Sequence, residues 1–176
     1  MIISQTPFRI SFVGGGTDLP AFYTQHGGAV ISTAIDKYIY ITVKRQNKLH
    51  GHKIRVGYSK TENVENVEDI EHPIVRETLK FLAIDDPIEI TTISDIPAKT
   101  GLGSSSAFTV GLLHALHAYK HEYVSKEQLA QEAVNIEIKI LGRPVGKQDH
   151  YASAYGGLNS IVFHPDDSVS VNPVLC

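Results

Sequence analysis

The apolar residues of this chain recur with two periods, and the shorter one marks the predicted strands. Runs rich in Val, Ile, Tyr, Phe and Thr predict strands at residues 2–13, 29–34, 38–46, 54–58, 88–93 and 158–163, with a further alternating one at 168–175. The first strand is expected to break at Thr6-Pro7, because proline has no amide hydrogen to donate to a neighbouring strand. The charged segment from Lys60 to Asp69 has few apolar residues and is expected to be a surface loop.

A spacing of three and four residues between apolar positions predicts the helices. They cover residues 19–25, 73–82, 125–141 and 152–155, and a long one starts at Ser104. Pro73 suits a first helical position, residues 125–128 match a capping box, and Gly142 suits a helix end. Because the strands cluster early and the helices follow, the pattern predicts an α+β fold rather than a doubly wound sheet.

The composition narrows the class of protein. The 176 residues include 42% hydrophobic and 20% charged ones, which suits one soluble globular domain. A net charge of −3 without a basic run argues against nucleic acid as a partner. No apolar run approaches a membrane span, Met1–Gln5 is too short and polar for a signal peptide, and the single Cys176 cannot form an internal disulfide. We therefore expect a cytoplasmic protein.

The stretch from Pro97 to Ala107 combines two glycines with three consecutive serines. It follows a predicted strand and precedes a predicted helix, so Ser104, Ser105 and Ser106 fall where helical amides have no partner within the helix. Such amides, the helix dipole and the hydroxyl groups together suit a phosphate group. The alternative is that the glycines only turn the chain and one serine caps the helix.

Two common phosphate-binding glycine patterns are excluded. A P-loop needs a lysine directly after its second glycine, where this chain has Ser104. A dinucleotide fingerprint needs a glycine or alanine three residues after the second glycine, where this chain has Ser106. A phosphate held at this turn is therefore held in another way.

A second glycine cluster, Gly14-Gly15-Gly16, follows the first predicted strand. Three glycines cost backbone entropy and add nothing to a core, so a ligand or another backbone is expected close to them, unless they form a plain loop. Thr17 and Asp18 then offer a hydroxyl and a carboxylate to that ligand, although Asp18 could instead cap a helix.

Phosphoryl transfer from a bound triphosphate would need an oxygen-ligated Mg²⁺, a cation and a group that meets the acceptor. A serine hydroxyl and Glu137 are candidates for the metal, Arg9 or Lys99 for the cation, and Asp149 for the acceptor. Each residue also has an ordinary role open to it, as an exposed helix carboxylate, a surface ion-pair partner or a helix cap. His114, His117 and His121 lie near one helix face, where a polar edge is favoured over a metal site because no carboxylate or Cys nearby completes a set of ligands.

The joint pattern resembles the GHMP kinases, a superfamily of sugar and mevalonate kinases. Residues 97–107 resemble its ATP-binding motif, and Gly146-Lys-Gln-Asp149 resembles the loop that carries its catalytic aspartate. Residues 7–18 resemble its first motif, with three glycines where galactokinases carry Gly-Glu-His. Residues 9–18 and 149–157 are most similar to the D-glycero-D-manno-heptose 7-phosphate kinases.

The resemblance implies ATP and Mg²⁺ as cofactors. Asp149 is expected to face the acceptor hydroxyl, and Arg9 is expected to hold Asp149 ionised and to offset charge on the phosphoryl group. Ser105 and Glu137 are expected to ligate Mg²⁺, with one extra residue between Glu137 and the aspartate relative to the family. The ATP contacts implied are Lys99, Gly101, Leu102, Gly103, Ser104, Ser105 and Ser106. The sugar contacts implied are Gly15, Gly16, Thr17 and Asp18.

The resemblance also implies an activity and a domain. Residues 1–176 correspond to the family's N-terminal, ATP-binding domain, an α+β fold of the ribosomal protein S5 domain 2 type. Family members continue into a C-terminal domain with a third glycine-rich motif, which these residues lack. We therefore expect weak nucleotide binding, slow turnover and self-association through the face that this domain would cover.

The implied reaction is ATP-dependent phosphorylation of the anomeric hydroxyl of D-glycero-D-manno-heptose 7-phosphate, giving the 1,7-bisphosphate. The expected partner is thus a small sugar phosphate, with neither nucleic acid nor membrane involved. The alternatives are a fucokinase or another sugar kinase of the superfamily, and a non-catalytic fragment that binds a sugar or a partner subunit.

Overall fold

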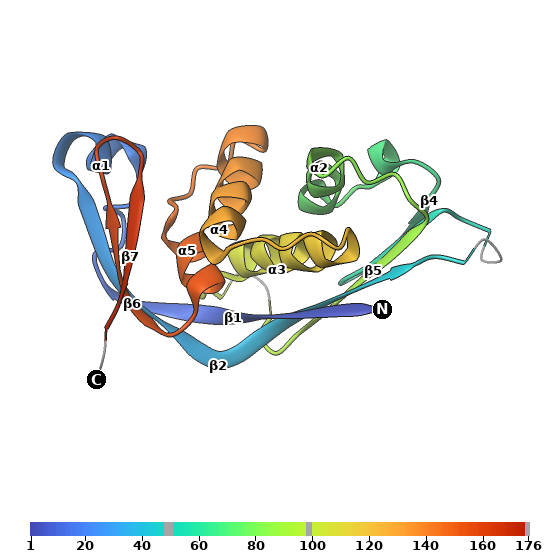
Figure 1. Cartoon of the computed structure of the whole chain (residues 1–176), viewed down its shortest axis with the longest axis horizontal. Coiled ribbons are helices and arrows are strands. Elements are labelled where there is room, and N and C mark those ends of the chain that lie inside the picture. The colour runs from blue at the N-terminus through green and yellow to red at the C-terminus, as the bar shows by residue number, and fades with distance from the viewer. Residues whose placement is uncertain (48–50, 98–99, 175–176) are drawn as a thin grey trace.

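A mixed sheet with helices packed on one of its faces forms the fold in the computed structural model, which describes residues 1–47, 51–97 and 100–174 (Figure 1). The sheet order is β4-β3-β5-β2-β6-β7, with β1 also paired to β2. All pairs are antiparallel except β3 with β5. The strands are β1 (Ile2–Val13), β2 (Gly28–Arg45), β3 (Ile54–Gly57), β4 (Thr61–Val64), β5 (Ile88–Ser94), β6 (Leu158–Phe163) and β7 (Val169–Pro173).

The helices are α1 (Pro20–His26), α2 (Pro73–Phe81), α3 (Ser104–Tyr119), α4 (Lys126–Val134) and α5 (Gln148–Tyr155), with a 3₁₀ turn η2 (Val67–Asp69) and a π-helical turn η3 (Asn135–Ile140). Helices α2 to α5 lie on the same side of the sheet (Figure 1). Gly103 rather than Ser104 caps α3, and Ser125 caps α4 by accepting a hydrogen bond from the Gln128 amide, as the capping box predicts. In the part of the chain that the structure describes, no helix has the length and hydrophobicity of a membrane span.

The long strand β2 is the central strand of the sheet and pairs with three of the other described strands. It pairs through residues 28–33 with β6, through residues 39–45 with β5, and with β1 in both parts. The two strands predicted at 29–34 and 38–46 are therefore one strand. The predicted break at Thr6-Pro7 is wrong: β1 runs through it, although its register against β2 shifts between Pro7 and Arg9 and again between Ser11 and Val13. Proline is tolerated there because β1 pairs, among the described strands, with β2 alone.

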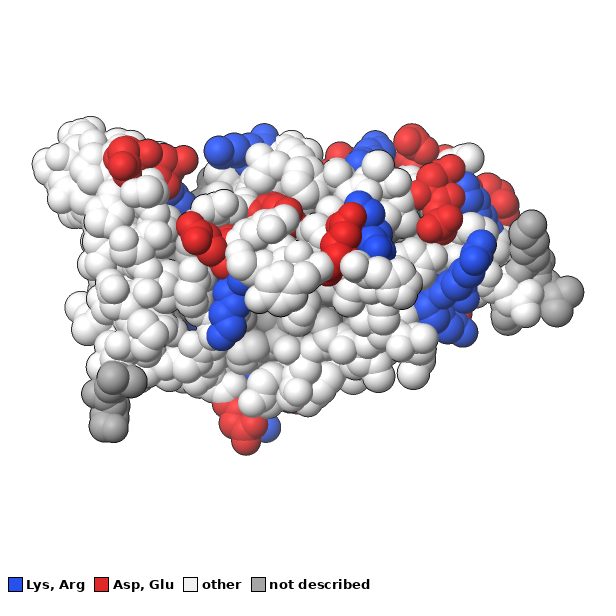
Figure 2. Space-filling model, viewed as in Figure 1, with Lys and Arg blue, Asp and Glu red and all other residues white. Residues whose placement is uncertain are grey.

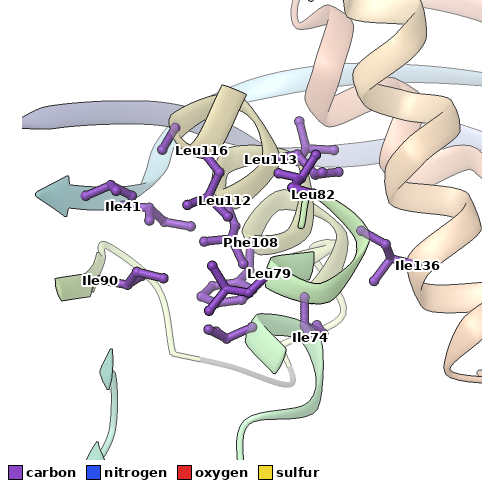
Figure 3. Close-up of a cluster of buried hydrophobic side chains, with 14 of the residues drawn as sticks. Ile41, Ile74, Leu79, Leu82, Ile90, Phe108, Leu112, Leu113, Leu116 and Ile136 are labelled. Atoms are coloured by element: carbon purple, nitrogen blue, oxygen red, sulfur yellow. The ribbon is translucent and has the colours of Figure 1, made fainter. Parts of the chain in front are cut away.

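Helix α3 lies at the centre of the hydrophobic core. Its side chains are buried almost all round, because β1 and β2 lie beneath it and α2, α4 and α5 lie beside it. Figure 3 shows side chains of α2 and α3 meeting those of the sheet. The labelled members are Ile41, Ile74, Leu79, Leu82, Ile90, Phe108, Leu112, Leu113, Leu116 and Ile136. This core fixes the N-terminus of α3 against the sheet.

The prediction of a surface loop at residues 60–69 is wrong. The segment contains β4 and η2, with Val67 buried in the core. Glu62 is also buried, where its carboxylate accepts hydrogen bonds from the backbone amides of Glu71 and His72 and from the Tyr58 hydroxyl. The negative charge of Glu62, which contributed to the prediction of a loop, thus stabilises the start of α2 instead.

Of the three histidines predicted to lie on a polar helix edge, His114 and His121 are exposed, but His117 is not. His117 is buried, and its two ring nitrogens lie 2.9 Å from Glu122 Oε2 and 2.7 Å from Glu132 Oε2. Glu122 follows α3 five residues after His117, whereas Glu132 comes from α4, and only the packing of the two helices brings it to this ring. Among the described residues, no group of three or more His, Cys, Asp or Glu is arranged to hold a metal ion.

Candidate active site

Asp149 and Arg9 form a two-pronged ion pair beside the glycine turn. Arg9 Nε and an Nη donate to the two carboxylate oxygens of Asp149 at 2.6 and 2.7 Å, and the other Nη donates to the carbonyl of Gly101 at 2.9 Å. The backbone amide of Arg9 donates to the carbonyl of Leu102. The pair, whose members lie 140 residues apart, therefore lies directly against the turn.

Gly103 explains why the turn needs glycine. Its φ is +76°, and a Cβ there would lie 3.3 Å from Arg9 Cγ and 3.4 Å from Asp149 Cγ. Gly101 has a similar φ of +78°, but a Cβ there would meet no atom within 4 Å. Both glycines provide left-handed backbone, and Gly103 also leaves room for the carboxylate.

Two anchors fix the N-terminus of α5, and with it Asp149 in the first helical turn. The buried Asp18 carboxylate accepts hydrogen bonds from the amide and the side chain of Gln148. The buried Lys147 donates to the carboxylate and the carbonyl of Asp167, in the β6–β7 turn. Asp149 itself is not the helix cap, since Lys147 occupies that position.

The hydroxyl of Tyr23 also donates to Asp167 at 2.6 Å, and Lys147 Nζ lies 4.2 Å from the centre of the Tyr23 ring. Hydrogen bonds from Lys147 and then Tyr23 hold the pKa of the Asp167 carboxyl below its usual range. The charged pair and the ring thus connect α1, the β6–β7 turn and the start of α5.

Glu137 is buried at the centre of a second polar cluster, which excludes the alternative of an exposed helix carboxylate. Its carboxylate accepts hydrogen bonds from Ser105 at 2.6 Å and Thr109 at 2.7 Å. Arg143 Nη lies 2.8 Å from the carboxylate oxygen that Ser105 contacts, and His150 Nε2 lies 3.2 Å from the other. The π-helical turn η3 turns Glu137 towards α3.

Burial raises the pKa of Glu137, but hydrogen bonds from His150, Ser105 and Thr109 and the charge of His150 together lower it to about 2. The carboxylate is therefore ionised at neutral pH. An ionised carboxylate oxygen next to a hydroxyl oxygen fits Mg²⁺, which prefers oxygen ligands and takes few of them from protein.

A cavity of about 900 Å³ opens next to this cluster. Ser104, Ser105 and Arg143 line one part of it. Elsewhere the His72 ring lies between Tyr58, at 4.8 Å between ring centres, and Phe108, at 4.9 Å. Burial, and then the charge of Arg143, lowers the pKa of His72 below its usual value. The cavity thus has an apolar aromatic wall and, at the start of α3, a polar end.

The loop of three glycines lies next to Gln148, the residue that precedes Asp149. Gly14 is required for packing, because a Cβ there would lie 1.9 Å from the carbonyl oxygen of Ala29. Gly15 approaches the Gln148 side chain, and Gly16 has a φ of +89° with open space around its Cβ position. Thr17 Oγ donates to the carbonyl of Gly14 at 2.8 Å, lies 3.1 Å from the carbonyl oxygen of Ala29 and accepts from the Ala29 amide.

The described residues bring together most of the positions that the motifs predicted. Thr17 and Asp18, predicted to bind sugar, have side chains that already bond within the loop or to Gln148. Lys99 lies outside the described residues. Direct ligand contacts stay predictions for the whole set.

Sequence reasoning missed several residues of this site. They are Thr109, His150, Arg143, His72 and Tyr58. Thr109 could have been found, because it lies four residues after Ser105 and hence on the same helix face. The others come from segments whose proximity only the sheet and helix packing decides.

A sequence model described as "GHMP kinases N terminal domain" matches residues 69–157, half of the chain. The matched range contains the glycine turn, Glu137 and Asp149. The chain belongs to the GHMP kinase family. The family and the α+β fold that the motifs predicted are thereby confirmed.

Curated relatives and solved structures agree with this assignment. The D-glycero-alpha-D-manno-heptose 7-phosphate kinase of Campylobacter jejuni is 30% identical over 186 residues, covering 98% of this chain and 54% of the relative. The mevalonate kinase of Saccharolobus solfataricus is 30% identical over 161 residues, covering 90% and 50%. A crystal structure of a D-glycero-D-manno-heptose 1-phosphate kinase from Bacteriodes thetaiotaomicron superposes with a TM-score of 0.89 at 28% identity, covering 99% of this chain and 60% of that one.

The chain spans about half the length of the curated relatives it matches. These relatives are kinases, so the GHMP match makes this chain part of a phosphotransferase family. Membership alone does not fix the acceptor, because two relatives at the same identity are named for a sugar phosphate and for mevalonate.

Proposed function

We propose that this chain is the nucleotide-binding half of an ATP-dependent kinase that phosphorylates the anomeric hydroxyl of D-glycero-D-manno-heptose 7-phosphate. The observation that carries the proposal is the position of Asp149, paired to Arg9 and in van der Waals range of the Cβ position at Gly103. The Asp149 carboxylate, which would contact the acceptor hydroxyl, thus lies next to the N-terminus of α3, whose free amides suit a phosphate group.

The nucleotide would bind across the cavity. Its base suits the aromatic wall of Tyr58, His72 and Phe108, and its phosphates suit the amides of the α3 start. Ser105 and Glu137 would hold Mg²⁺, which supplies charge stabilisation to the phosphates when it is bound. The lowered pKa of Glu137 supports this assignment, because it keeps the carboxylate charged.

Asp149 would accept a hydrogen bond from the sugar hydroxyl and direct its oxygen towards the terminal phosphate. A loose transition state demands little base strength, so orienting the hydroxyl is the main task. Arg9 fixes both carboxylate oxygens, which limits the rotation of Asp149, and its charge lies where negative charge develops. The anchors at Asp18 and Lys147 hold the helix that carries this carboxylate.

The choice of a heptose phosphate rests on the first motif and on the names of two relatives. Gly14-Gly15-Gly16-Thr17-Asp18 lies beside Gln148, next to Asp149, as a sugar-binding loop would. A fucokinase would use the same anomeric chemistry, but its substrate has no phosphate and would need no cation for one.

The experiment that tests this proposal is a coupled ADP assay of a version extended by a C-terminal half of the kind that the relatives carry. We expect turnover with heptose 7-phosphate and at most a trace with fucose, whereas the reverse would support a fucokinase. Residues 1–176 alone are expected to turn over far more slowly, because they correspond to only about half of the relatives' length and would position the substrates and exclude water less well. Equal turnover by both versions would contradict that expectation.

Titration calorimetry with Mg-ATP separates the kinase from a non-catalytic module. Weak binding heat to residues 1–176 is expected. The absence of heat at every concentration tried, in both the short and the extended version, would favour a fragment that binds a sugar or a partner instead.

A further inference from the structure

Arg143 makes two short contacts that the proposed reaction does not explain. One guanidinium nitrogen lies 2.5 Å from Ser105 Oγ and 2.8 Å from Glu137 Oε2. Those two oxygens lie 2.6 Å from each other. A positive group thus bridges the same hydroxyl and carboxylate oxygen that a divalent cation would bridge.

The other approaches to Glu137 are already occupied. Its second oxygen contacts Thr109 and His150, and the residue as a whole is 1% exposed. Arg143, whose side chain is 32% exposed, and the half-buried Ser105 are the two members of the cluster that line the cavity. A cation that reaches this carboxylate oxygen from the cavity therefore has to displace a guanidinium that already contacts both that oxygen and Ser105 Oγ.

The side chain of Arg143 can move without its backbone. The backbone is fixed, because the Arg143 amide donates to the carbonyl of Glu137 and its carbonyl accepts from Val145. The side chain is long and flexible, and its head lies at the polar end of the cavity where phosphates would bind.

We propose that Arg143 occupies the divalent-cation position of the nucleotide-free protein and becomes a phosphate-binding residue when the cation arrives. The exchange keeps a positive charge next to the buried Glu137 at every stage, which avoids the cost of an uncompensated buried carboxylate. The displaced guanidinium remains in the cavity, where a planar, two-pronged donor suits phosphate oxygens. This inference rests on the proposed function, since it takes Ser105 and Glu137 as the metal ligands.

The test measures the dissociation constant of Mn²⁺ in the absence of nucleotide, with electron paramagnetic resonance as the readout. It compares the unaltered protein with Arg143→Met. We expect at least about tenfold tighter Mn²⁺ binding in Arg143→Met, because the competing charge is gone. Binding of metal-free ADP is expected to weaken several-fold in the same variant, because a phosphate contact is lost. Arg55→Met, which removes a guanidinium that pairs with Glu89 and does not line the cavity, should change neither.

Unchanged or weaker Mn²⁺ binding in Arg143→Met would overturn the inference, and so would the absence of Mn²⁺ binding in both proteins. If Arg143→Met does not fold, the unaltered protein still decides the question. The ¹⁵N–¹H resonance of the Arg143 side chain should shift on addition of Mg²⁺, and no shift at saturating Mg²⁺ would overturn the inference. Tighter Mn²⁺ binding without any kinase activity would uphold the cation exchange and sink the proposed reaction, so the two failures can be told apart.

Discussion

At the scale of single residues, the site depends on how closely a carboxylate can approach a backbone turn. Asp149 reaches the turn because position 103 has no side chain, and Arg9 holds the carboxylate there through both oxygens. Arginine suits this position better than lysine, because its planar fork matches the two oxygens of a carboxylate. The geometry thus turns one glycine and one arginine into positioning residues for the proposed reaction.

Gly103→Ala and Gly101→Ala form a matched pair that separates backbone strain from crowding. Both positions have a left-handed φ, so each alanine is expected to cost roughly 1–2 kcal/mol of unfolding free energy. Only the alanine at 103 presses on Arg9 and Asp149. We therefore expect urea unfolding to show similar losses, with a larger loss of Mg-ATP affinity or turnover in Gly103→Ala. Equal functional losses in the two variants would argue against the close approach.

At the scale of secondary-structure elements, buried charges join segments that the hydrophobic pattern leaves separate. Glu62 joins β4 to the start of α2, and Lys147 joins the start of α5 to the β6–β7 turn. Each joint satisfies backbone or charged groups that would otherwise be buried without partners. Both joints lie at the border of the proposed site, so their integrity affects the geometry of its walls.

Glu62→Gln is expected to destabilise the protein at neutral pH and not at low pH. Burial raises the pKa of Glu62, but hydrogen bonds from the Tyr58 hydroxyl and two backbone amides outweigh it and hold the pKa below its usual value of 4.5. The ionised carboxylate therefore stabilises the fold above that value, and this contribution is lost as the pH falls through the lowered pKa. A loss of roughly 1–3 kcal/mol at pH 7, shrinking below about pH 4, is expected from urea unfolding. The exposed Glu68→Gln is the control, and a pH-independent loss in Glu62→Gln would contradict the account.

Lys147→Met is expected to loosen α5 without removing a ligand contact. We expect a loss of roughly 1–2 kcal/mol in urea unfolding, since a charged hydrogen bond to the half-exposed Asp167 disappears. Turnover of the extended version should fall about tenfold with little change in the KM for ATP, because Asp149 is less well positioned. Lys126→Met removes a contact at the other end of α5 and should leave turnover unchanged. A change in KM alone would assign Lys147 to nucleotide binding instead.

The elements differ in how well the sequence could predict them. The strand, glycine turn and long helix around Gly103 follow from local periodicity and turn chemistry, and the structure has them. The structure of residues 60–69 could not be predicted from the sequence, because nothing in the sequence distinguishes the buried Glu62 from an exposed glutamate. The contacts of Glu137 with Arg143 and His150 could not be read either, since they depend on a π-helical turn and on packing between α3 and α5.

At the scale of the whole molecule, the face of the sheet opposite the helices carries apolar side chains. Ile3, Phe12 and Ile93 are 57%, 65% and 62% exposed, whereas their neighbours Ser4 and Ile41 are buried under α3. On the face drawn in Figure 2, acidic and basic side chains lie intermixed over the helices, and much of the surface nearer the sheet is uncharged. Exposed apolar patches of this kind favour association with another surface.

Residues 1–176 are accordingly expected to self-associate. Sedimentation velocity should show a concentration-dependent increase in mass for the parent, and Ile93→Asp should reduce it because a charge cannot be buried without a partner. Tyr123→Ser, at an exposed position outside this face, is the control. A monomer at every concentration would contradict the expectation.

The whole account depends on Asp149 meeting the acceptor next to the bound triphosphate, and one comparison tests it most directly. Turnover with heptose 7-phosphate and Mg-ATP binding are measured for the extended protein and its Asp149→Asn variant, with the exposed Asp85→Asn as control. We predict a fall in kcat of about a hundredfold or more in Asp149→Asn, with the Mg-ATP dissociation constant unchanged. An unchanged kcat in Asp149→Asn, with Arg9 still in place, would contradict the role given to this carboxylate.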